Sequence, residues 1–412
     1  MLTALYADQN GTIYDAPGYQ AVGRSGDAAV TLTDADMIPL PPQAELMFLP
    51  GRSAVAVQKG VIAPIARELA AVAAILPAGY TRTLLPAFDR LPDAPQLPLF
   101  GYTAVAFKKG RLWAAAIKSD DTSKWNPELY NGSDLEQRIA AVKRDLPGNR
   151  IVEQLAKCSL TWHCLTAQNL FYRRWEAGIP VSPACNANCY GCISLQPAEC
   201  CPSPQSRINF APTAAEIAAV GAYHLSRAPE AIVSFGQGCE GEPSLACENV
   251  SEAIRLIRGQ TQQGLININT NAGFCRGIES IVDAGLNSMR VSMISAVPDV
   301  YQSYYRGNYS LDAVASSIDY AKARGVYVSI NLLLFPGLND SDGEIKAWQR
   351  FIRERGIDMI QLRNLNADPD DFWRFMNRPA APAAGVAAFI AALRQASPEL
   401  VIGSFSRYRE NG

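Results

Sequence analysis

Three cysteines within eight residues are the strongest chemical signal in the sequence. Cys185, Cys189 and Cys192 have the spacing C-x3-C-x2-C in the segment SPACNANCYGCIS. One loop of this length is compact enough to direct three thiolates at a single [4Fe–4S] cluster. A cluster held by four cysteines transfers electrons, whereas three ligands leave one iron open to a substrate or cofactor. The spacing therefore predicts an iron–sulfur cluster with an open coordination position.

Two other interpretations of this motif stay open. Zinc prefers four tetrahedral ligands from paired motifs, and no second C-x2-C occurs in the sequence. Cys200 or Cys201 could supply a fourth thiolate. The site would then be a structural zinc site or a fully ligated electron-transfer cluster.

The remaining cysteines either pack as small hydrophobic side chains or build an auxiliary cluster. They are Cys158, Cys164, Cys200, Cys201, Cys239, Cys247 and Cys275. Their spacings match no compact metal motif, which favours buried thiols over an auxiliary cluster. Cys158 and Cys164 are expected on different faces of one helix over 151–176, so with His163 they make a poor chelate for one metal.

A short acidic segment follows the second expected strand of the region behind the cysteines. It contains Glu240, Gly241 and Glu242, in SFGQGCEGEPSL. A glycine lets the main chain approach a ligand closely, and a carboxylate accepts hydrogen bonds from an ammonium group. A plain glycine-rich loop is the alternative interpretation.

Polar side chains on later strands are the other candidate ligands for a bound cofactor. A buried strand should be apolar, so polar residues there indicate hydrogen bonding to a ligand. A salt-bridged strand residue or a buried hydroxyl is the alternative. The candidates are Asn269 and Asn271 in the third strand, Arg290 and Ser292 on one face of the fourth, Asn331 in the fifth, and Gln361, with Arg363 and Asn364, at the sixth.

The elements that must position these residues form a βα repeat. Apolar runs at 179–184, 231–236, 265–272, 289–295, 326–335 and 359–365 alternate with helical patterns such as 213–227, 311–324 and 343–355. Strands that are apolar and buried on both faces, joined by right-handed crossovers, predict a parallel sheet, open or curled into a barrel. Ligands gather at the carboxyl ends of such strands, where the candidates fall.

Three parts are expected along the chain. Residues 1–120 are predicted to form a smaller β-rich N-terminal domain, with a hairpin that turns at Lys109-Gly110. Residues 121–178 are predicted to be a helical connector, in which Ser133 caps a helix that ends at Gly148. Residues 179–412 are predicted to form the α/β part, a parallel (β/α)6-type partial barrel with a C-terminal helical and strand extension.

Composition narrows the class of protein. Of 412 residues, 48% are hydrophobic and 18% charged, which is typical of globular proteins. The 37 basic and 39 acidic residues give a net charge of −2, which disfavours nucleic acid as a partner. No apolar run reaches the about 18 residues of a membrane span and the N-terminus lacks a signal-peptide pattern, so a cytoplasmic location without membrane attachment is expected. In that reducing compartment, clustered cysteines indicate metal binding or catalysis.

The cysteine spacing, its place after the first strand and the βα repeat behind it resemble the radical S-adenosylmethionine (SAM) superfamily, over roughly 179–365. The resemblance implies a [4Fe–4S] cluster whose open iron binds SAM, and cleavage of SAM to a 5′-deoxyadenosyl radical that abstracts hydrogen from a substrate. The resemblance does not specify the overall reaction, so the enzyme could be an oxidoreductase, a transferase or a lyase.

The resemblance also extends to the candidate residues. Gly241-Glu242-Pro243 resembles the family's Gly-Gly-Glu-Pro segment, with Glu240 in place of the first glycine. Arg290 and Ser292 resemble pairs that reach the SAM carboxylate and ribose, and 336–340 resembles a stretch that packs near adenine. The family usually has an aromatic residue directly before the third cysteine; here Gly191 holds that place and Tyr190 stands one earlier.

The partners that the resemblance implies are a peptide or small-molecule substrate and a reductase of flavodoxin or ferredoxin type, under anaerobic conditions. Residues 1–120 are then a candidate lid or substrate-docking module. No Asp-x-His-x-x-Gly motif occurs, which disfavours a cobalamin-binding module, and His224 is expected to be a surface or core histidine. The alternative is a non-catalytic iron–sulfur electron carrier or a zinc-braced binding protein.

Overall fold

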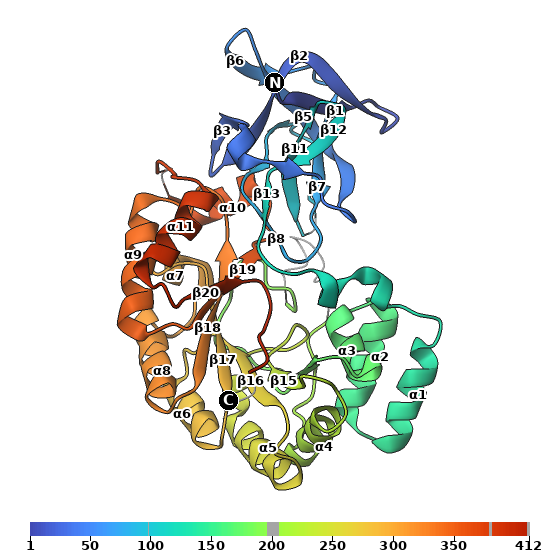
Figure 1. Ribbon diagram of the computed structural model, residues 1–412, viewed down its shortest axis with the longest axis vertical. Helices are drawn as coiled ribbons and strands as arrows, with labels where there is room; N and C mark the ends of the chain where they lie inside the picture. Colours follow the sequence, from blue (N-terminus) through green and yellow to red (C-terminus); the bar gives the residue numbers. More distant parts are fainter. Residues whose placement is uncertain (98, 196–205, 379–380, 410–412) are drawn as a thin grey trace.

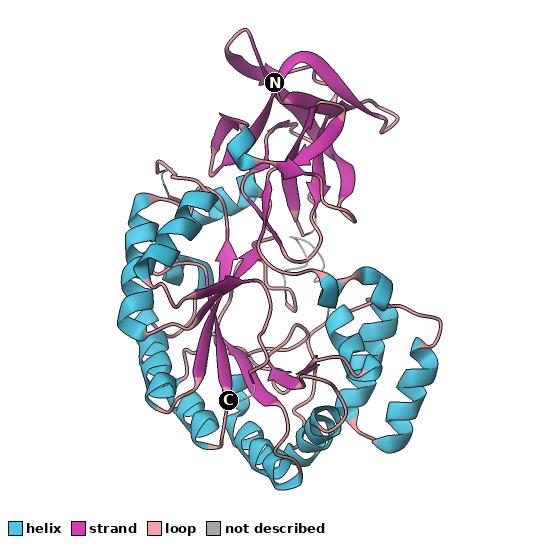
Figure 2. Ribbon diagram, in the orientation of Figure 1, coloured by secondary structure: helices cyan, strands magenta, loops and turns pink. Residues whose placement is uncertain are grey.

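The computed structural model describes residues 1–97, 99–195, 206–378 and 381–409. An antiparallel sheet formed by the N-terminal part lies above a curved parallel sheet formed by the rest of the chain (Figure 1). Helices surround the outer side of the parallel sheet in an open arc (Figure 2). The predicted α/β partial barrel with a β-rich N-terminal domain is confirmed in this form.

The N-terminal part consists of thirteen strands and one short 3-10 helix, η1 (Asp34–Asp36), among the described residues. Eleven strands share one sheet, and β8 pairs with β13. The predicted hairpin is confirmed, since Lys108 of β11 pairs with Arg111 of β12. The strands are β1 (Thr3–Ala7), β2 (Ile13–Ser25), β3 (Ala28–Thr31), β4 (Ile38–Pro39), β5 (Glu45–Gln58), β6 (Val61–Pro64), β7 (Ala70–Ile75), β8 (Tyr80–Arg82), β9 (Leu85–Pro86), β10 (Phe88–Arg90), β11 (Tyr102–Lys108), β12 (Arg111–Ala114) and β13 (Ala116–Lys118).

The connector contains η2 (Ser123–Trp125), η3 (Pro127–Leu129), α1 (Leu135–Asp145), α2 (Arg150–Thr161) and α3 (Leu165–Tyr172). Two expectations were wrong here. Asp134, and not Ser133, precedes the first turn of α1. The single helix expected over 151–176 is broken at His163, whose φ of 49° is left-handed. After the break, the N–H of Cys164 donates a hydrogen bond to the carbonyl of Cys158 (3.1 Å). Residues around 176–179 are strand and not helix.

The parallel sheet has seven strands in the order β14 to β20. Its first strand lies three residues before the expected run at 179–184. The strands are β14 (Glu176–Ile179), β15 (Ile232–Phe235), β16 (Leu265–Thr270), β17 (Ser288–Met293), β18 (Tyr327–Leu334), β19 (Met359–Asn364) and β20 (Val401–Gly403). The helices are α4 (Ala214–Leu225), η4 (Pro243–Ala246), α5 (Cys247–Gln260), α6 (Cys275–Asp283), α7 (Pro298–Tyr305), α8 (Leu311–Ala323), α9 (Asp342–Arg355), α10 (Pro369–Met376) and α11 (Val386–Ala396).

The two faces of the parallel strands differ in chemistry. Residues such as Val233, Ile268 and Val291 face the helices and join one large hydrophobic core. The alternating residues face the inside of the curved sheet, and most are polar, because successive side chains of a strand point to opposite faces. The strands are buried on both faces, but they enclose a polar lumen and not a filled core.

The C-terminal segment crosses the gap between the last strand, β20, and the first, β14. The N–H groups of Ser404 and Phe405 donate to Asp120 Oδ2 (2.7 and 3.1 Å), and Arg407 pairs with Asp120 Oδ1 (2.8 Å). The hydroxyl of Ser406 donates to Glu176 Oε2 at the start of β14 (2.8 Å). Among the described residues β14 and β20 do not pair, so this segment covers an opening in the barrel wall.

The N-terminal domain is fixed to the chain that follows β18 and β19. Arg52, which is fully buried, pairs with Asp368 just before α10 (2.6 Å). The buried Arg82 donates to the carbonyl of Leu365, directly after β19. The N–H of Gly26 donates to the carbonyl of Pro336, after β18 (2.9 Å). The domain therefore rests on the carboxyl-end side of the barrel, and the stretch 336–340 contacts it.

No helix in the part of the chain that the structure describes is both long and apolar enough to cross a membrane.

His224 is a core residue of α4, as expected, and its titration should make stability depend on pH. Its Nε2–H donates to the carbonyl of Trp175 (3.3 Å), and burial lowers the pKa of His224 to about 4. The unfolded chain, with a histidine pKa near 6.5, binds the proton more readily than the folded one. The contribution of neutral His224 to the free energy of unfolding is therefore fully present above about pH 6.5. It falls as the pH drops towards 4, by about 2 kcal/mol between pH 7 and pH 5.

Urea unfolding at several pH values measures this loss. His224→Gln should remove that part of the pH dependence, whereas His163→Gln, at the exposed second histidine, should keep the wild-type slope. Equal slopes for His224→Gln and the wild type would contradict the assignment.

Candidate active site

The cysteine loop begins directly after β14 and is held between two other segments. The N–H of Gly241 donates to the carbonyl of Ser182, and the N–H of Glu242 donates to that of Ala184 (both 2.7 Å). On its other side, the N–H of Asn188 donates to the carbonyl of Tyr305, at the end of α7 (2.9 Å). These main-chain bonds fix both flanks of the loop at the carboxyl end of the first strand.

Cys185, Cys189 and Cys192 are partly exposed free thiols on this loop. Burial raises the pKa of Cys189, and negative charge on the other two cysteines raises it further, so the three sulfurs are close enough to repel one another as thiolates. Bound cations would remove that repulsion, which suits an iron–sulfur cluster. Arg207 Nη2 also approaches Cys192 Sγ (3.8 Å). Within the described residues, no three His, Cys, Asp or Glu side chains already surround a metal position, so the thiols are neighbours and not a finished coordination sphere.

Gly191 has a left-handed φ of 69°, a conformation that favours glycine and disfavours an aromatic residue. The aromatic residue thus stands one position earlier, at Tyr190. The Tyr190 ring packs against Phe375 and Phe372 of α10, with centroids 4.5 and 5.7 Å away. The structure brings Tyr190 into an aromatic cluster at the mouth of the barrel.

The carboxylates of Glu240 and Glu242 are buried, and both bind to the protein itself. Glu240 accepts hydrogen bonds from the N–H groups of Val181 and Ser182 through Oε2 (2.8 and 3.0 Å) and of Gly236 through Oε1 (2.7 Å). Burial raises the pKa of Glu240 to about 8, although these donors favour its charged form. Glu242 accepts from the N–H groups of Ser244 and Asn271. Both side chains therefore tie the ends of neighbouring strands together.

A cavity of about 560 Å³ occupies the lumen and reaches the cysteine loop at Cys192. Five of the predicted strand residues line it: Asn269, Arg290, Ser292, Asn331 and Arg363. Asn271 and Gln361 do not. The amide of Asn271 donates to Asn186 Oδ1 on the cysteine loop (2.7 Å), and Gln361 lines a separate pocket with Ser406 and Arg407.

Glu176 is a lumen residue that sequence reasoning assigned to the connector. Its Oε1 accepts from Ser234, Gln237 and Arg290 (2.7, 2.6 and 3.0 Å). Burial opposes its ionisation, but the charge of Arg290 and the hydrogen bonds from Ser234, Ser406 and Arg290 together outweigh burial and lower the pKa of Glu176. A charged residue within the apolar segment EAGI was the signal that could have identified it.

Three further cysteines also reach the lumen. Cys158, Cys164 and Cys239 line the cavity, and the Cys158 and Cys239 thiols share a hydrogen bond. The break between α2 and α3 brings Cys164 to the same cavity as Cys158, so the expectation that one helix separates them was wrong. An auxiliary cluster stays the less favoured alternative; Cys247 and Cys275 do not line this cavity, and Cys200 and Cys201 lie outside the described residues.

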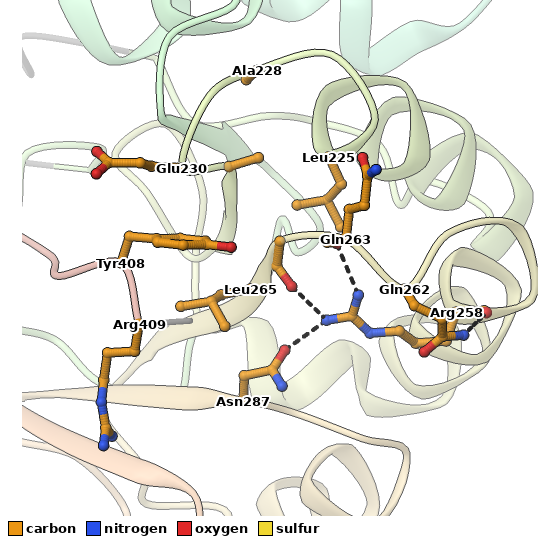
Figure 3. Close-up of a pocket in the computed structure, with 12 residues that line it drawn as sticks. Leu225, Ala228, Glu230, Arg258, Gln262, Gln263, Leu265, Asn287, Tyr408 and Arg409 are labelled. Carbon is orange, nitrogen blue, oxygen red and sulfur yellow. Dashed lines mark hydrogen bonds between the residues drawn. The ribbon is translucent and has the colours of Figure 1, made fainter. Parts of the chain in front are cut away.

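A second cavity, of about 480 Å³, lies near the start of β16 and the C-terminal segment (Figure 3). Arg258 points into it, and its guanidinium group donates to the carbonyls of Gln263 and Gly264 and to Asn287 Oδ1 (3.0, 3.1 and 2.7 Å). Leu265, Tyr408 and Arg409 line the same cavity. None of the described cysteines does, so the loop chemistry belongs to the lumen.

Comparison with known proteins agrees with this geometry. A family model, "Radical SAM superfamily", matches residues 179–348, which span the cysteine loop and the lumen strands up to β18. This protein contains a radical SAM domain. Members of this superfamily bind a [4Fe–4S] cluster and SAM.

Curated relatives match only part of this chain. GTP 3′,8-cyclase of Staphylococcus carnosus is 27% identical over 97 residues, which cover 24% of this chain and 28% of that protein. A probable dual-specificity RNA methyltransferase RlmN of Chlorobium luteolum is 33% identical over 144 residues, covering 31% and 40%. The chain thus spans less than half the length of these relatives.

Solved structures similar to this chain are also radical SAM proteins. A radical SAM methyltransferase from Sphaerobacter thermophilus has a TM-score of 0.39 and 21% identity, with 57% of this chain and 67% of that chain covered. SuiB of Streptococcus suis, bound to its precursor peptide SuiA, has a TM-score of 0.39 and 13% identity, with 65% and 60% covered.

Proposed function

We propose that this protein is a radical SAM enzyme acting on a peptide or small-molecule substrate. When bound to Cys185, Cys189 and Cys192, the reduced [4Fe–4S] cluster supplies the electron that cleaves SAM to methionine and a 5′-deoxyadenosyl radical, which takes hydrogen from the substrate. The observation that carries this proposal is the three-cysteine loop after β14, which reaches a cavity lined in part by polar strand residues of the radical SAM domain.

The residues of the chain bind and orient the two reactants. The predicted SAM contacts divide into two groups. Asn269, Arg290, Ser292 and Asn331 face the cavity and can donate or accept hydrogen bonds there. The others hold or flank the loop that would carry the cluster: Tyr190, Gly191, Glu240, Gly241, Glu242 and Asn271, with Gln361 deeper in the barrel. The docked N-terminal domain would exclude water from the mouth.

The same proposal includes the organisation and the partners. We take β14–β19 as the (β/α)6-type unit, to which β20 adds a seventh strand. The parts are 1–120, 121–178 and 179–412, with the first barrel strand beginning already at Glu176. The N-terminal domain serves as lid or docking module. A flavodoxin- or ferredoxin-type reductase supplies electrons, and the free thiols of the eight described cysteines suit the cytoplasm.

The test is 5′-deoxyadenosine formation by the anaerobically reconstituted, dithionite-reduced protein with SAM. The wild type should form it and Cys189→Ala should not. An intact, reducible cluster that forms no product, and whose spectrum SAM leaves unchanged, would contradict the proposal and favour an electron carrier. Cys200→Ala with Cys201→Ala separates the alternatives further. It should spare a three-cysteine cluster and destroy a zinc or electron-transfer site that needs a fourth thiolate.

A further inference from the structure

We propose that the lumen binds an oxyanionic group of the substrate, a carboxylate or a phosphate, through the guanidinium group of Arg363. The inference rests on the proposed function, because it assigns the lumen to the substrate of that reaction. It narrows the substrate to a small molecule that carries at least one such group.

Arg363 is a cation in the cavity without an acidic partner. It lies near the end of β19, lines the cavity, and uses only its Nε–H in a hydrogen bond, to Asn331 Oδ1 (3.2 Å). Its guanidinium carbon lies 5.8 Å from the centroid of the Phe405 ring. No carboxylate among the described residues lies within ion-pair distance of it. Burial, together with the charge of Arg290, lowers the pKa of Arg363 to about 10.

Three other arginines, of which Arg52 and Arg290 are buried and Arg258 is half-buried like Arg363, have their partners inside the protein. Arg52 pairs with Asp368, and Arg290 pairs with Glu176 (2.6 and 3.0 Å). Arg258, which has no carboxylate partner, donates to three oxygens. Removing a cation from water without compensating hydrogen bonds costs free energy. A ligand that supplies the missing hydrogen bonds recovers part of this cost, which suits an arginine in a binding cavity. Arg363 differs from the other three because two N–H-bearing nitrogens stay available towards the cavity.

The carboxylates around the lumen are already committed to other groups. Glu176 binds Arg290, and Asp120 binds Arg407 and two N–H groups. Glu240 also lines the cavity, but its oxygens accept three main-chain N–H groups. Arg290 and Arg363 thus face the cavity together with one ion-pairing carboxylate, Glu176. The excess positive charge fits an anion, and the planar guanidinium fork suits a carboxylate or a phosphate.

Cavity size and position favour the substrate over a larger partner. About 560 Å³ lies within the range of small-molecule sites. The cavity runs from Cys192 at the cysteine loop to Arg363, Phe405 and Trp125 near the opening in the barrel wall. An anionic group held at Arg363 leaves the rest of the molecule directed towards the cysteine loop, where the radical would form.

The test uses the full chain without cluster or SAM, and inorganic phosphate and acetate as probes. The thermal unfolding midpoint is measured in each anion and in chloride at equal ionic strength, for the wild type, Arg363→Gln and the matched control Arg258→Gln. We expect phosphate or acetate to raise the wild-type midpoint by roughly 2–4 °C over chloride. Arg363→Gln should lose this increment, and Arg258→Gln should keep it. A larger effect of phosphate assigns a phosphate group, and a larger effect of acetate a carboxylate.

A second readout separates a ligand-binding arginine from a structural one. In chloride, Arg363→Gln should unfold at the same or a higher temperature than the wild type, because it removes a half-buried cation that has no carboxylate partner, whereas Arg258→Gln should unfold at a lower one. Equal anion increments in wild type and Arg363→Gln would overturn the proposal. If Arg363→Gln does not fold, Arg363→Lys, which keeps the charge but loses the fork, should show a reduced increment, and an undiminished one would overturn it.

The anion could also be the carboxylate of SAM, and one further measurement decides this. SAM affinity of the reconstituted protein is compared in phosphate and in chloride. Equal affinities support the substrate assignment, and competition by phosphate would overturn it. The anion titration needs neither cluster nor SAM. A failure of the anion-binding proposal can therefore be distinguished from a failure of the proposed function, which 5′-deoxyadenosine formation tests.

Discussion

Gly241→Ala is expected to prevent the protein from holding its cluster. A Cβ atom at Gly241 would lie 1.9 Å from the carbonyl oxygen of Ala184 and 2.5 Å from its carbon, both main-chain atoms. Ala184 directly precedes Cys185, so the loop must move to admit the methyl group. A displacement of about 1 Å in a reacting site can cost about 100-fold in rate, and we expect a fall of that order in 5′-deoxyadenosine formation. Iron content and the visible absorbance of the reconstituted protein measure cluster loss.

Gly259→Ala is the matched control for this variant. Gly259 lies in α5, and a Cβ atom there would meet nothing within 4 Å. Alanine should therefore keep the cluster and stabilise the helix by roughly 0.5–1 kcal/mol. A Gly241→Ala protein with full iron content and wild-type activity would show that the close approach of the two segments does not position the cysteines.

Glu176→Gln is expected to lower the free energy of unfolding by about 3–5 kcal/mol, the range for breaking a buried ion pair from one side. The substitution keeps the shape of the side chain but leaves Arg290, which is buried, without a countercharge. It also leaves Arg290 and Arg363 in one cavity without an ion-paired carboxylate, and like charges there repel. Urea unfolding at neutral pH measures the loss.

Two further variants test the cause of that loss. Glu248→Gln, at an exposed glutamate on α5, should be close to neutral. Glu176→Gln combined with Arg290→Met removes both charges and should recover part of the stability, since a buried ion pair can be replaced by apolar groups at little cost. A double variant as unstable as the sum of the two single variants would indicate that the charges do not interact.

Local sequence patterns were sufficient for several features of this protein. The spacing of Cys185, Cys189 and Cys192 lies within one loop, and its chemistry is a property of that loop. The turn at Lys109-Gly110 and helices such as α4 and α9 follow from residues close in sequence. The first strand was misplaced, and one helix was predicted where two occur, because the left-handed residue His163 interrupts a helical pattern that continues across it.

The positions of the strand residues were predictable, but their partners were not. Periodicity placed Arg290 and Ser292 on one face, and both line the cavity. Glu240 and Glu242 accept main-chain N–H groups from three neighbouring segments, and the sequence did not predict these partners. Whether a buried carboxylate faces a ligand or the protein depends on where the adjacent strand ends lie, and that is not encoded in the spacing of its own segment.

The sequence by itself determined the cysteine loop, the βα repeat and the β-rich N-terminal part, because each depends on short-range periodicity or spacing. Only the tertiary structure decided which charges lie in the lumen. Glu176 and Arg290 are 114 residues apart, and they meet because β14 and β17 curve into one barrel. Arg363 is left without a carboxylate for the same reason: burial and the packing of distant strands, and not the neighbours in sequence, set the partners of a charged side chain.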